Sequence, residues 1–157
     1  MTKELYSSDS YIKAFEATVI DVNQEDGFIV LDQTAFYPGG GGQPCDYGMI
    51  RFGDASCRIE KVKKQGSDIA HYTSDTLPEK GVTVSGEIDW QRRYQLMKTH
   101  TTLHLMCGVI WRDYQARVTG GNMEPGKGRL DFELESFSAE LVREIEEKIN
   151  QEVENSR

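Results

Sequence analysis

Short runs of alternating apolar and polar residues fill the first part of the chain, a pattern typical of β-strands with one buried face. Turn residues separate the runs, and Asp26-Gly27 is a strong hairpin signal. The runs occupy residues 11–22, 28–31, 48–52, 56–63, 69–72 and 82–88. One face of the first run is expected to carry Phe15, Ala17, Val19 and Asp21. Because about six short strands with regular turns are typical of small barrels, residues 1–88 are predicted to form an N-terminal β-barrel.

A helical period replaces this alternation at Asp89, whose side chain can cap a helix by accepting a backbone N–H bond. The helix is predicted to run to about Tyr114. Its stripe at helical spacing comprises Leu96, His100, Leu103, His104, Cys107, Ile110 and Trp111.

Beyond this helix, residues 117–119 and 129–134 are predicted to form the two strands of a hairpin joined by residues 120–128. A second helix is predicted to begin at Ser138. Its apolar face comprises Leu141, Val142, Ile145, Ile149 and Val153. The chain is therefore predicted to be of the α+β class, with residues 89–157 as a second domain.

Composition narrows the class of protein. The 157 residues suffice for one large or two small domains, and 38% hydrophobic with 28% charged residues argues against wholesale disorder. No apolar run approaches the length of a membrane-spanning helix, and residues 1–6 lack signal-peptide character. Cys45, Cys57 and Cys107 form no CxxC pair, which favours free thiols in a reducing compartment. A cytoplasmic protein without membrane contact is expected.

The net charge of −8 argues against general nucleic-acid binding, because phosphate contacts need Lys and Arg. Residues 132–157 account for −5, however, and the other 131 residues carry only −3. The latter include two basic clusters, Lys61-Lys63-Lys64 and Arg92-Arg93-Lys98. Such clusters are usually solvated surface, and local patches for phosphate contact are the alternative.

His100 and His104 lie one helical turn apart, so both imidazoles point the same way and can bind one divalent cation, usually zinc. They are two of only three histidines in the chain. Spacing alone is weak, since zinc needs at least three protein ligands and Thr101 stands where a metalloprotease helix has Glu. The alternative is a pair satisfied by hydrogen bonds at the edge of a core.

Four consecutive glycines, Gly39 to Gly42, lie between two predicted strands and are flanked by Pro38 and Pro44. This placement favours a shaped loop over a flexible linker. Such a loop could pack against a ligand or present N–H groups to a carbonyl or phosphate. It does not match a P-loop, since no Lys follows the last glycine, and a purely structural turn is the alternative.

Alternation along residues 129–132 places Arg129 and Asp131 on one face of a strand, with Leu130 and Phe132 on the other. A surface ion pair is the simpler interpretation of Arg129 and Asp131. A role in shaping a polar pocket is the alternative.

These motifs, in this order, resemble the editing module of alanyl-tRNA synthetase and its free-standing relatives, the AlaX-type alanyl-tRNA editing deacylases. Residues 32–48, DQTAFYPGGGGQPCDYG, are similar to the family signature D-x-T-x-F-Y-P-x-G-G-G-Q-x-x-D-x-G. Similar elements follow at family spacing: Arg92-Arg93, MKTHTTLHL at 97–105, VTGG at 118–121 and RLDF at 129–132. The resemblance covers residues 15–155 and favours the larger free-standing type.

The resemblance implies a barrel of translation-protein type followed by the α+β editing domain shared with threonyl-tRNA synthetase. It also implies hydrolysis of the ester that joins a wrong amino acid, chiefly serine and secondarily glycine, to the acceptor end of alanine tRNA. His100 and His104 would be zinc ligands, and Thr119 would meet the serine hydroxyl. Further candidates are Gly120, Gly121, Gly41, Gly42 and Gln43 for substrate, Arg129 and Asp131 for pocket shape, and Lys61, Lys63, Lys64, Arg92, Arg93 and Lys98 for tRNA phosphate.

One departure concerns the zinc site, which the family completes with a C-x-x-x-H pair that this sequence lacks. We therefore expect a C-terminally truncated fragment that holds half of the zinc site. Its open sheet edge would invite pairing with a second copy. The alternatives are a non-catalytic tRNA-binding or accessory module, and a metal-dependent hydrolase of some small ester.

Overall fold

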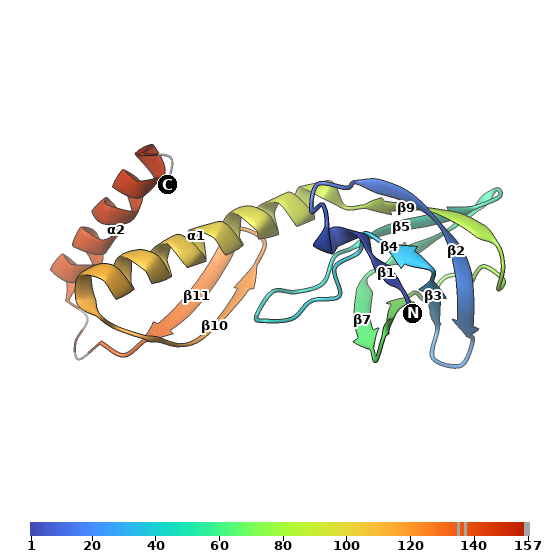
Figure 1. Ribbon diagram of the computed structural model, residues 1–157, viewed down its shortest axis with the longest axis horizontal. Helices are drawn as coiled ribbons and strands as arrows, with labels where there is room; N and C mark the ends of the chain where they lie inside the picture. The colour runs from blue at the N-terminus through green and yellow to red at the C-terminus, as the bar shows by residue number, and fades with distance from the viewer. Residues whose placement is uncertain (135, 137, 156–157) are drawn as a thin grey trace. The chain divides into compact units, whose positions relative to one another are not determined.

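The computed structural model describes residues 1–134, 136 and 138–155. The chain forms two compact units, Met1–Tyr94 and Gln95–Arg157. Helix α1 (Trp90–Tyr114) begins in the first unit and continues in the second (Figure 1). Strands predominate in the first unit and a second helix lies in the other, which confirms the predicted α+β class.

The first unit is built on a seven-stranded antiparallel sheet with the order β6-β5-β9-β2-β3-β8-β7. Its strands are β2 (Ala14–Asn23), β3 (Phe28–Leu31), β5 (Gly48–Phe52), β6 (Ala55–Ile59), β7 (Lys61–Gln65), β8 (Asp68–Tyr72) and β9 (Thr83–Ile88). Two short strands, β1 (Lys3–Glu4) and β4 (Gln33–Thr34), pair in parallel, and a 3-10 turn (Leu5–Ser7) follows β1. The prediction of β3 and β5 is confirmed, but the predicted strand 56–63 is divided at Glu60 into β6 and β7.

Glu60 is the single residue between the two edge strands of this sheet. The sheet must therefore curl until its edges approach each other at that corner, because one residue spans only a few ångströms. Among the strands described, however, no hydrogen-bonded ladder joins β6 to β7. Closure into the predicted barrel is unconfirmed.

The main hydrophobic core includes Phe15, Ala17 and Val19 of β2, as predicted. The prediction for Asp21 is wrong, since this residue is exposed. A register shift between Val19 and Asp21 inserts an extra residue into β2 where it pairs with β3. Such a bulge exchanges the two faces of a strand, and Val22 packs against the core instead.

The second unit combines α1 with the antiparallel hairpin of β10 (Val118–Glu124) and β11 (Lys127–Phe132), followed by α2 (Ala139–Glu154). Both predicted helix starts are confirmed. Asp89 Oδ1 accepts the Arg92 N–H at 3.1 Å, and Ser138 Oγ accepts the Leu141 N–H at 3.1 Å. The hairpin is longer than predicted, because most of the glycine-rich connection pairs as strand and the turn is confined to Pro125-Gly126.

The buried faces of the two helices are narrower than predicted. Leu96 and Ile110 of α1 and Ile145 of α2 are buried, and Ile110 and Ile145 share one hydrophobic cluster. The predicted apolar positions that are exposed are Trp111, Val142 and Val153. Neither described helix has the length and apolar character needed to cross a membrane.

Candidate functional site

His100 and His104 lie on consecutive turns of α1, with ring centroids 4.7 Å apart and an interplanar angle of 14°. Their Nε2 atoms are separated by 2.9 Å. Two ring nitrogens this close cannot both present lone pairs or both present protons to each other, so they must share a proton or a cation. A tetrahedral zinc ion with Zn–N bonds of about 2.05 Å would hold two nitrogens roughly 3.3 Å apart. The pair therefore fits two positions of such a site with little movement.

A complete zinc site needs more than this pair, because structural and catalytic sites use at least three protein ligands. Within the part of the chain that the structure describes, no group of three or more His, Cys, Asp and Glu side chains could hold a metal ion. Cys107 is near in sequence, but burial raises the pKa of its thiol and disfavours the thiolate form that zinc binds. Among the described residues, the geometry would thus allow two ligands, His100 and His104.

Thr119, Gly120 and Gly121 lie in β10 at a break in its pairing with β11. Val118 pairs with Phe132 and Gly120 pairs with Asp131, so Thr119 is the extra residue of a β-bulge. Bulges change the direction of side chains and are common beside active sites. Thr119 is exposed, and its hydroxyl can therefore reach a ligand.

Arg129 and Asp131 form an ion pair of 3.3 Å on β11 with side chains that are 67% and 48% exposed. An exposed pair of this kind stabilises a protein by less than about 1 kcal/mol. A Cβ atom on Gly120 would lie 3.1 Å from Asp131 Oδ2, so the carboxylate borders the bulge. The structure thus brings this pair next to the Thr119 region.

A cavity of about 470 Å³ lies between α1 and the turn of the β10–β11 hairpin. Its floor is organised by Thr99, whose Oγ1 accepts the Gly126 N–H at 3.0 Å and donates to the Gln95 carbonyl at 2.9 Å. A Cβ atom on Gly128 would lie 2.7 Å from Leu103, so glycine is what allows this close approach. Sequence reasoning missed Thr99 because no local pattern marks a residue that binds a distant turn. The lining residues are Gln95, Lys98, Thr99, Thr102, Leu103, Met106, Gly126 and Gly128.

In the first unit, residues 37–46 form a narrow loop that the sequence predicts to be shaped. At its base, Asp46 N–H donates to the Tyr37 carbonyl at 3.0 Å and Tyr37 N–H donates to Asp46 Oδ2 at 2.7 Å. At its tip, Gly40 and Gln43 exchange two backbone hydrogen bonds of 3.0 Å around Gly41 and Gly42. All four glycines have φ between +59° and +135°, which residues with a Cβ rarely adopt. The loop is a defined structure whose tip exposes backbone.

The base of this loop is held by a buried ion pair between Asp46 and Arg93. Arg93 Nε donates to both carboxylate oxygens at 2.9 and 3.0 Å, and Nη2 also contacts Oδ2. The other guanidinium donors bind the Ser10 carbonyl at 2.8 Å and the Ala35 carbonyl at 2.6 Å. Because Arg93 is 3% exposed and its donors are engaged in these contacts, its guanidinium is not presented to a phosphate.

Arg92 lies closer to solvent than Arg93 and is half-buried. Its guanidinium carbon is 3.9 Å from the centroid of the Tyr47 ring, and Nη2 donates to the Cys45 carbonyl at 3.3 Å. Lys98 is exposed on the second unit. The side chains of Arg92 and Lys98 can therefore contact a phosphate without disrupting the fold.

Lys61, Lys63 and Lys64 lie on the edge strand β7 and are exposed. Alternation places Lys61 and Lys63 on one face of the strand and Lys64 on the other. Lys61 Nζ lies 4.2 Å from the Tyr72 ring centroid, whereas Lys64 Nζ pairs with Glu4 at 2.6 Å. Lys61 and Lys63 are therefore the better candidates for a ligand.

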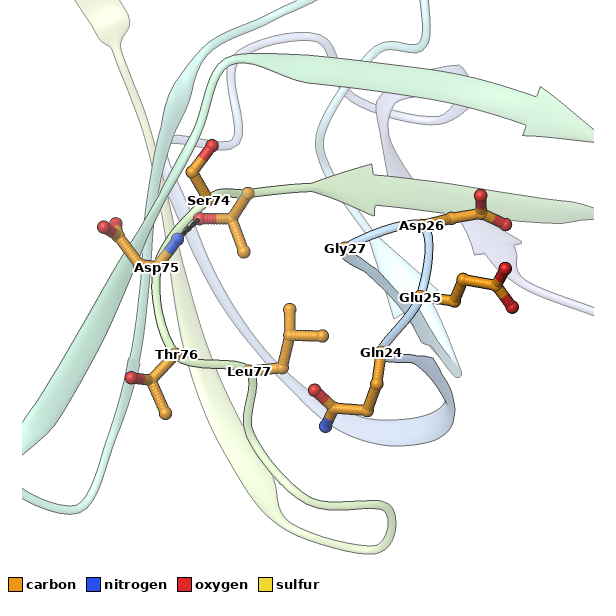
Figure 2. Close-up of a pocket in the computed structure, with 9 residues that line it drawn as sticks. Gln24, Glu25, Asp26, Gly27, Ser74, Asp75, Thr76 and Leu77 are labelled. Carbon is orange, nitrogen blue, oxygen red and sulfur yellow. Dashed lines mark hydrogen bonds between the residues drawn. The ribbon is translucent and has the colours of Figure 1, made fainter.

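A cavity of about 510 Å³ also lies between the β2–β3 turn and the loop after β8, lined by residues 24–27 and 73–77. Glu25, Asp26 and Asp75 border it. Figure 2 shows the carboxylates of Glu25 and Asp26 directed away from the loop of residues 73–77, so the three acids do not converge on a cation. None of the predicted site residues lines this cavity.

Comparison with known proteins places this chain in a family. The profile of the tRNA synthetases class II (A) matches residues 9–92, slightly more than half of the chain. The alanine–tRNA ligase of Ignicoccus hospitalis is 41% identical over 99% of this chain. The alanyl-tRNA editing proteins AlaX-M of Methanosarcina mazei and Saccharolobus solfataricus are 42% and 37% identical over 96% and 98% of it. The chain belongs to the AlaX-type alanyl-tRNA editing family.

The AlaX-type assignment confirms the resemblance that the sequence motifs predict. The family profile contains the glycine loop, and the alignments with the relatives extend over the histidine pair as well. The AlaX-type chain spans 17% of the length of the Ignicoccus hospitalis ligase. It spans 63% and 66% of the two AlaX-M proteins.

Proposed function

We propose that this chain is part of a zinc-dependent trans-editing deacylase that hydrolyses mischarged alanine tRNA, chiefly the seryl and secondarily the glycyl ester. The observation that carries the proposal is the convergence of His100 and His104 at 2.9 Å, in a chain whose relatives are alanyl-tRNA editing proteins. The larger architecture that we propose is a translation-protein-type barrel followed by an editing domain.

An aminoacyl ester is already activated, so its hydrolysis needs positioning and charge stabilisation more than a strong nucleophile. Zinc held partly by His100 and His104 would supply a Lewis acid for the ester carbonyl or a water molecule. Two ligands fit the described residues, and the remaining ligands must come from elsewhere in the functional protein.

Selectivity for serine over alanine is proposed to lie in the Thr119 hydroxyl on its bulge. When a bound substrate covers this exposed hydroxyl, serine supplies a hydrogen-bond partner, whereas alanine leaves the hydroxyl without one and is disfavoured. Gly120 and Gly121 have no side chain that would obstruct a substrate bound next to Thr119. Arg129 and Asp131 would define the polar rim.

The tRNA acceptor end is proposed to contact exposed cations and the glycine loop. Lys61, Lys63, Arg92 and Lys98 are the candidates for phosphate contact, with Lys64 in a lesser role. The tip of the loop, at Gly41, Gly42 and Gln43, would present backbone to the substrate. We place the protein in the cytoplasm, where charged tRNA is used.

The deacylase proposal is tested with seryl and glycyl esters of alanine tRNA. The chain is assayed alone and fused to the unaligned remainder of an AlaX-M relative, with and without added zinc. We expect the fused form to release serine faster than uncatalysed hydrolysis and to lose that activity when zinc is removed. A fused form that binds zinc but leaves seryl-tRNA intact would overturn the proposal.

The histidine ligands are tested by His104→Ala in the same fused form. We expect loss of zinc and at least about 10²-fold slower deacylation, with the first unit still folded. Asn122→Ala, on the β10–β11 hairpin and outside the proposed site, is the matched control and is expected to retain zinc. Unchanged metal content in His104→Ala would disprove the ligand assignment.

The two-stranded sheet β10–β11 leaves one edge of each strand unpaired among the described residues. Open edges can pair with a second copy of a chain. We propose weak self-association through this sheet, and sedimentation over a range of protein concentrations tests it. A molecular mass that stays at the monomer value at the highest concentration would contradict it.

A further inference from the structure

Three aromatic side chains gather where the N-terminal segment meets the first turns of α1. Trp90 and Tyr94 stack with centroids 5.7 Å apart at 23°, and Tyr11 lies 5.7 Å from Trp90 at 47°. Lys13 Nζ is 4.7 Å from the Trp90 ring centroid. Tyr11 is 60% exposed and Tyr94 42% exposed. Tyr11, Lys13, Trp90 and Tyr94 are called the aromatic platform below.

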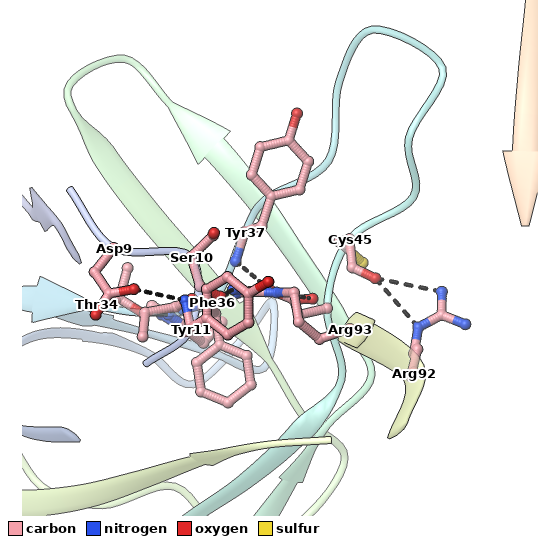
Figure 3. Close-up of polar contacts among 12 residues, drawn as sticks. Asp9, Ser10, Tyr11, Thr34, Phe36, Tyr37, Cys45, Arg92 and Arg93 are labelled. Atoms are coloured by element: carbon pink, nitrogen blue, oxygen red, sulfur yellow. Dashed lines mark hydrogen bonds and ion pairs between the residues drawn. The ribbon is translucent and has the colours of Figure 1, made fainter. Parts of the chain in front are cut away.

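The backbone beneath the platform is held by polar contacts (Figure 3). Asp9 Oδ1 accepts the Tyr11 N–H at 2.8 Å, and the buried Arg93 donates to the Ser10 carbonyl at 2.8 Å. The exposed Tyr11 ring therefore stands on a fixed backbone, beside the half-buried Trp90. A rigid aromatic surface loses little conformational entropy when a planar ligand stacks on it.

The charged residues near the platform are mostly acidic, which favours a ligand that brings few phosphate groups to this surface. Asp9 accepts a backbone N–H, Asp89 caps α1, and Glu87 pairs with Arg51 at 3.1 Å. Lys13 is the cation of the platform itself. One lysine can neutralise one phosphate, which is too little for binding driven by the nucleic-acid backbone alone.

We propose that the aromatic platform stacks an unpaired nucleobase of the tRNA, with Lys13 on the adjoining phosphate. The inference rests on the proposed function only for tRNA as the ligand. Base stacking tolerates an acidic protein because every base presents a π-face, whereas phosphate contacts do not. With a net charge of −8, this chain needs such a charge-independent contribution to hold tRNA.

Tryptophan fluorescence tests the platform directly, because the chain has only two tryptophans. The Trp111→Phe variant leaves Trp90 as the single reporter. We expect saturable quenching by alanine tRNA and by a single-stranded ACCA ribonucleotide, and much weaker quenching by a blunt RNA duplex. The double variant Tyr11→Ala, Tyr94→Ala in this background should bind alanine tRNA and the ACCA ribonucleotide roughly tenfold more weakly.

Two further variants separate stacking from structural damage. Tyr11→Phe keeps the ring and should retain the affinity, and thermal unfolding verifies that all variants fold. Lys13→Ala should reduce the slope of log affinity against log salt by about 1. Affinity that falls equally in Tyr11→Phe and in the alanine variant would overturn stacking as the cause.

The remaining outcomes distinguish this inference from the proposed deacylase. Unchanged tRNA affinity and unchanged Trp90 emission in the double alanine variant would overturn stacking and leave the deacylase untouched. Quenching by ACCA in a protein whose fused form fails to hydrolyse seryl-tRNA would support stacking and contradict the deacylase. Emission that depends on protein concentration and not on RNA would make the platform a protein contact, which also overturns stacking.

Discussion

His71 is the histidine outside the HxxxH pair, and it is fully buried in β8. Its Nε2 lies 2.8 Å from Thr34 Oγ1, and its Nδ1 lies 3.4 Å from the Ile29 carbonyl oxygen. Burial lowers the pKa of His71 from 6.5 to about 4, and hydrogen bonds to the Ile29 and Ile69 carbonyls offset only part of that effect. At neutral pH this residue is therefore a neutral part of the core.

Acid should weaken the first unit through His71. Between pH 6.5 and about 4 the unfolded chain binds a proton at this position and the folded chain does not, so the unfolding free energy falls as pH falls. Between pH 7 and pH 4.5 the expected loss is about 2–3 kcal/mol, at about 1.4 kcal/mol per pKa unit. Urea unfolding at pH 7 and pH 4.5 measures it. The His71→Gln variant should lose less stability over this range, and an equal loss in both proteins would contradict the assignment.

At the scale of elements, Gly48 and Gly108 differ in the space that their surroundings leave for a side chain. A Cβ atom on Gly48 of β5 would lie 2.1 Å from the Glu87 carbonyl oxygen and 2.8 Å from the Phe36 ring. A Cβ atom on Gly108 of α1 would meet no atom within 4 Å. Gly48 is thus required for the packing of β5 against β9. Gly108 is not required for packing, and it only raises the conformational entropy of the unfolded chain.

Alanine substitution should separate these two glycines. Gly48→Ala is expected to lower the unfolding free energy by about 3 kcal/mol or more, since neighbouring backbone must move. Gly108→Ala is expected to raise it by about 0.5–1 kcal/mol, because the helix gains a better helix former. Urea unfolding of both variants measures the difference. Equal stability of the two would show that the strands do not approach as closely as described.

At the scale of the whole molecule, the Arg93–Asp46 pair joins segments that are distant in sequence. It connects the start of α1 to the base of the glycine loop, and Arg93 also binds the Ser10 and Ala35 carbonyls. Removing one member of a buried pair leaves the other charge without compensation. This contact therefore supports both the glycine loop and the aromatic platform.

Asp46→Ala should lower the unfolding free energy by about 3–5 kcal/mol. It should also increase proteolytic cleavage in residues 37–46, because the loop loses its base. Glu87→Ala is the matched control, since it removes an exposed pair with Arg51 and should cost less than about 1 kcal/mol. Similar losses for the two variants would show that the buried pair has no special role.

Elements with strong local signals could be predicted from the sequence. β3 lies between Asp26-Gly27 and Asp32 and follows the predicted range, and both helices begin at a side chain that caps them. The sequence predicts too short a first strand for the β10–β11 hairpin, because glycines normally indicate a connection. Here Gly120, Gly121 and Gly128 pair within the strands. The break at Glu60 is not marked by a turn residue, since neither glycine nor proline occurs between residues 55 and 65.

The candidate site could likewise be predicted from the sequence only in part. Helical spacing alone determined that His100 and His104 face the same side of α1, and motif order determined the family. Only the tertiary structure decided that Arg93 is buried, that a bulge moves Asp21 out of the core, and that Thr119 stands on another bulge. The reason is physical: spacing within one element depends on local backbone geometry, whereas burial and register depend on contacts between segments far apart in the chain.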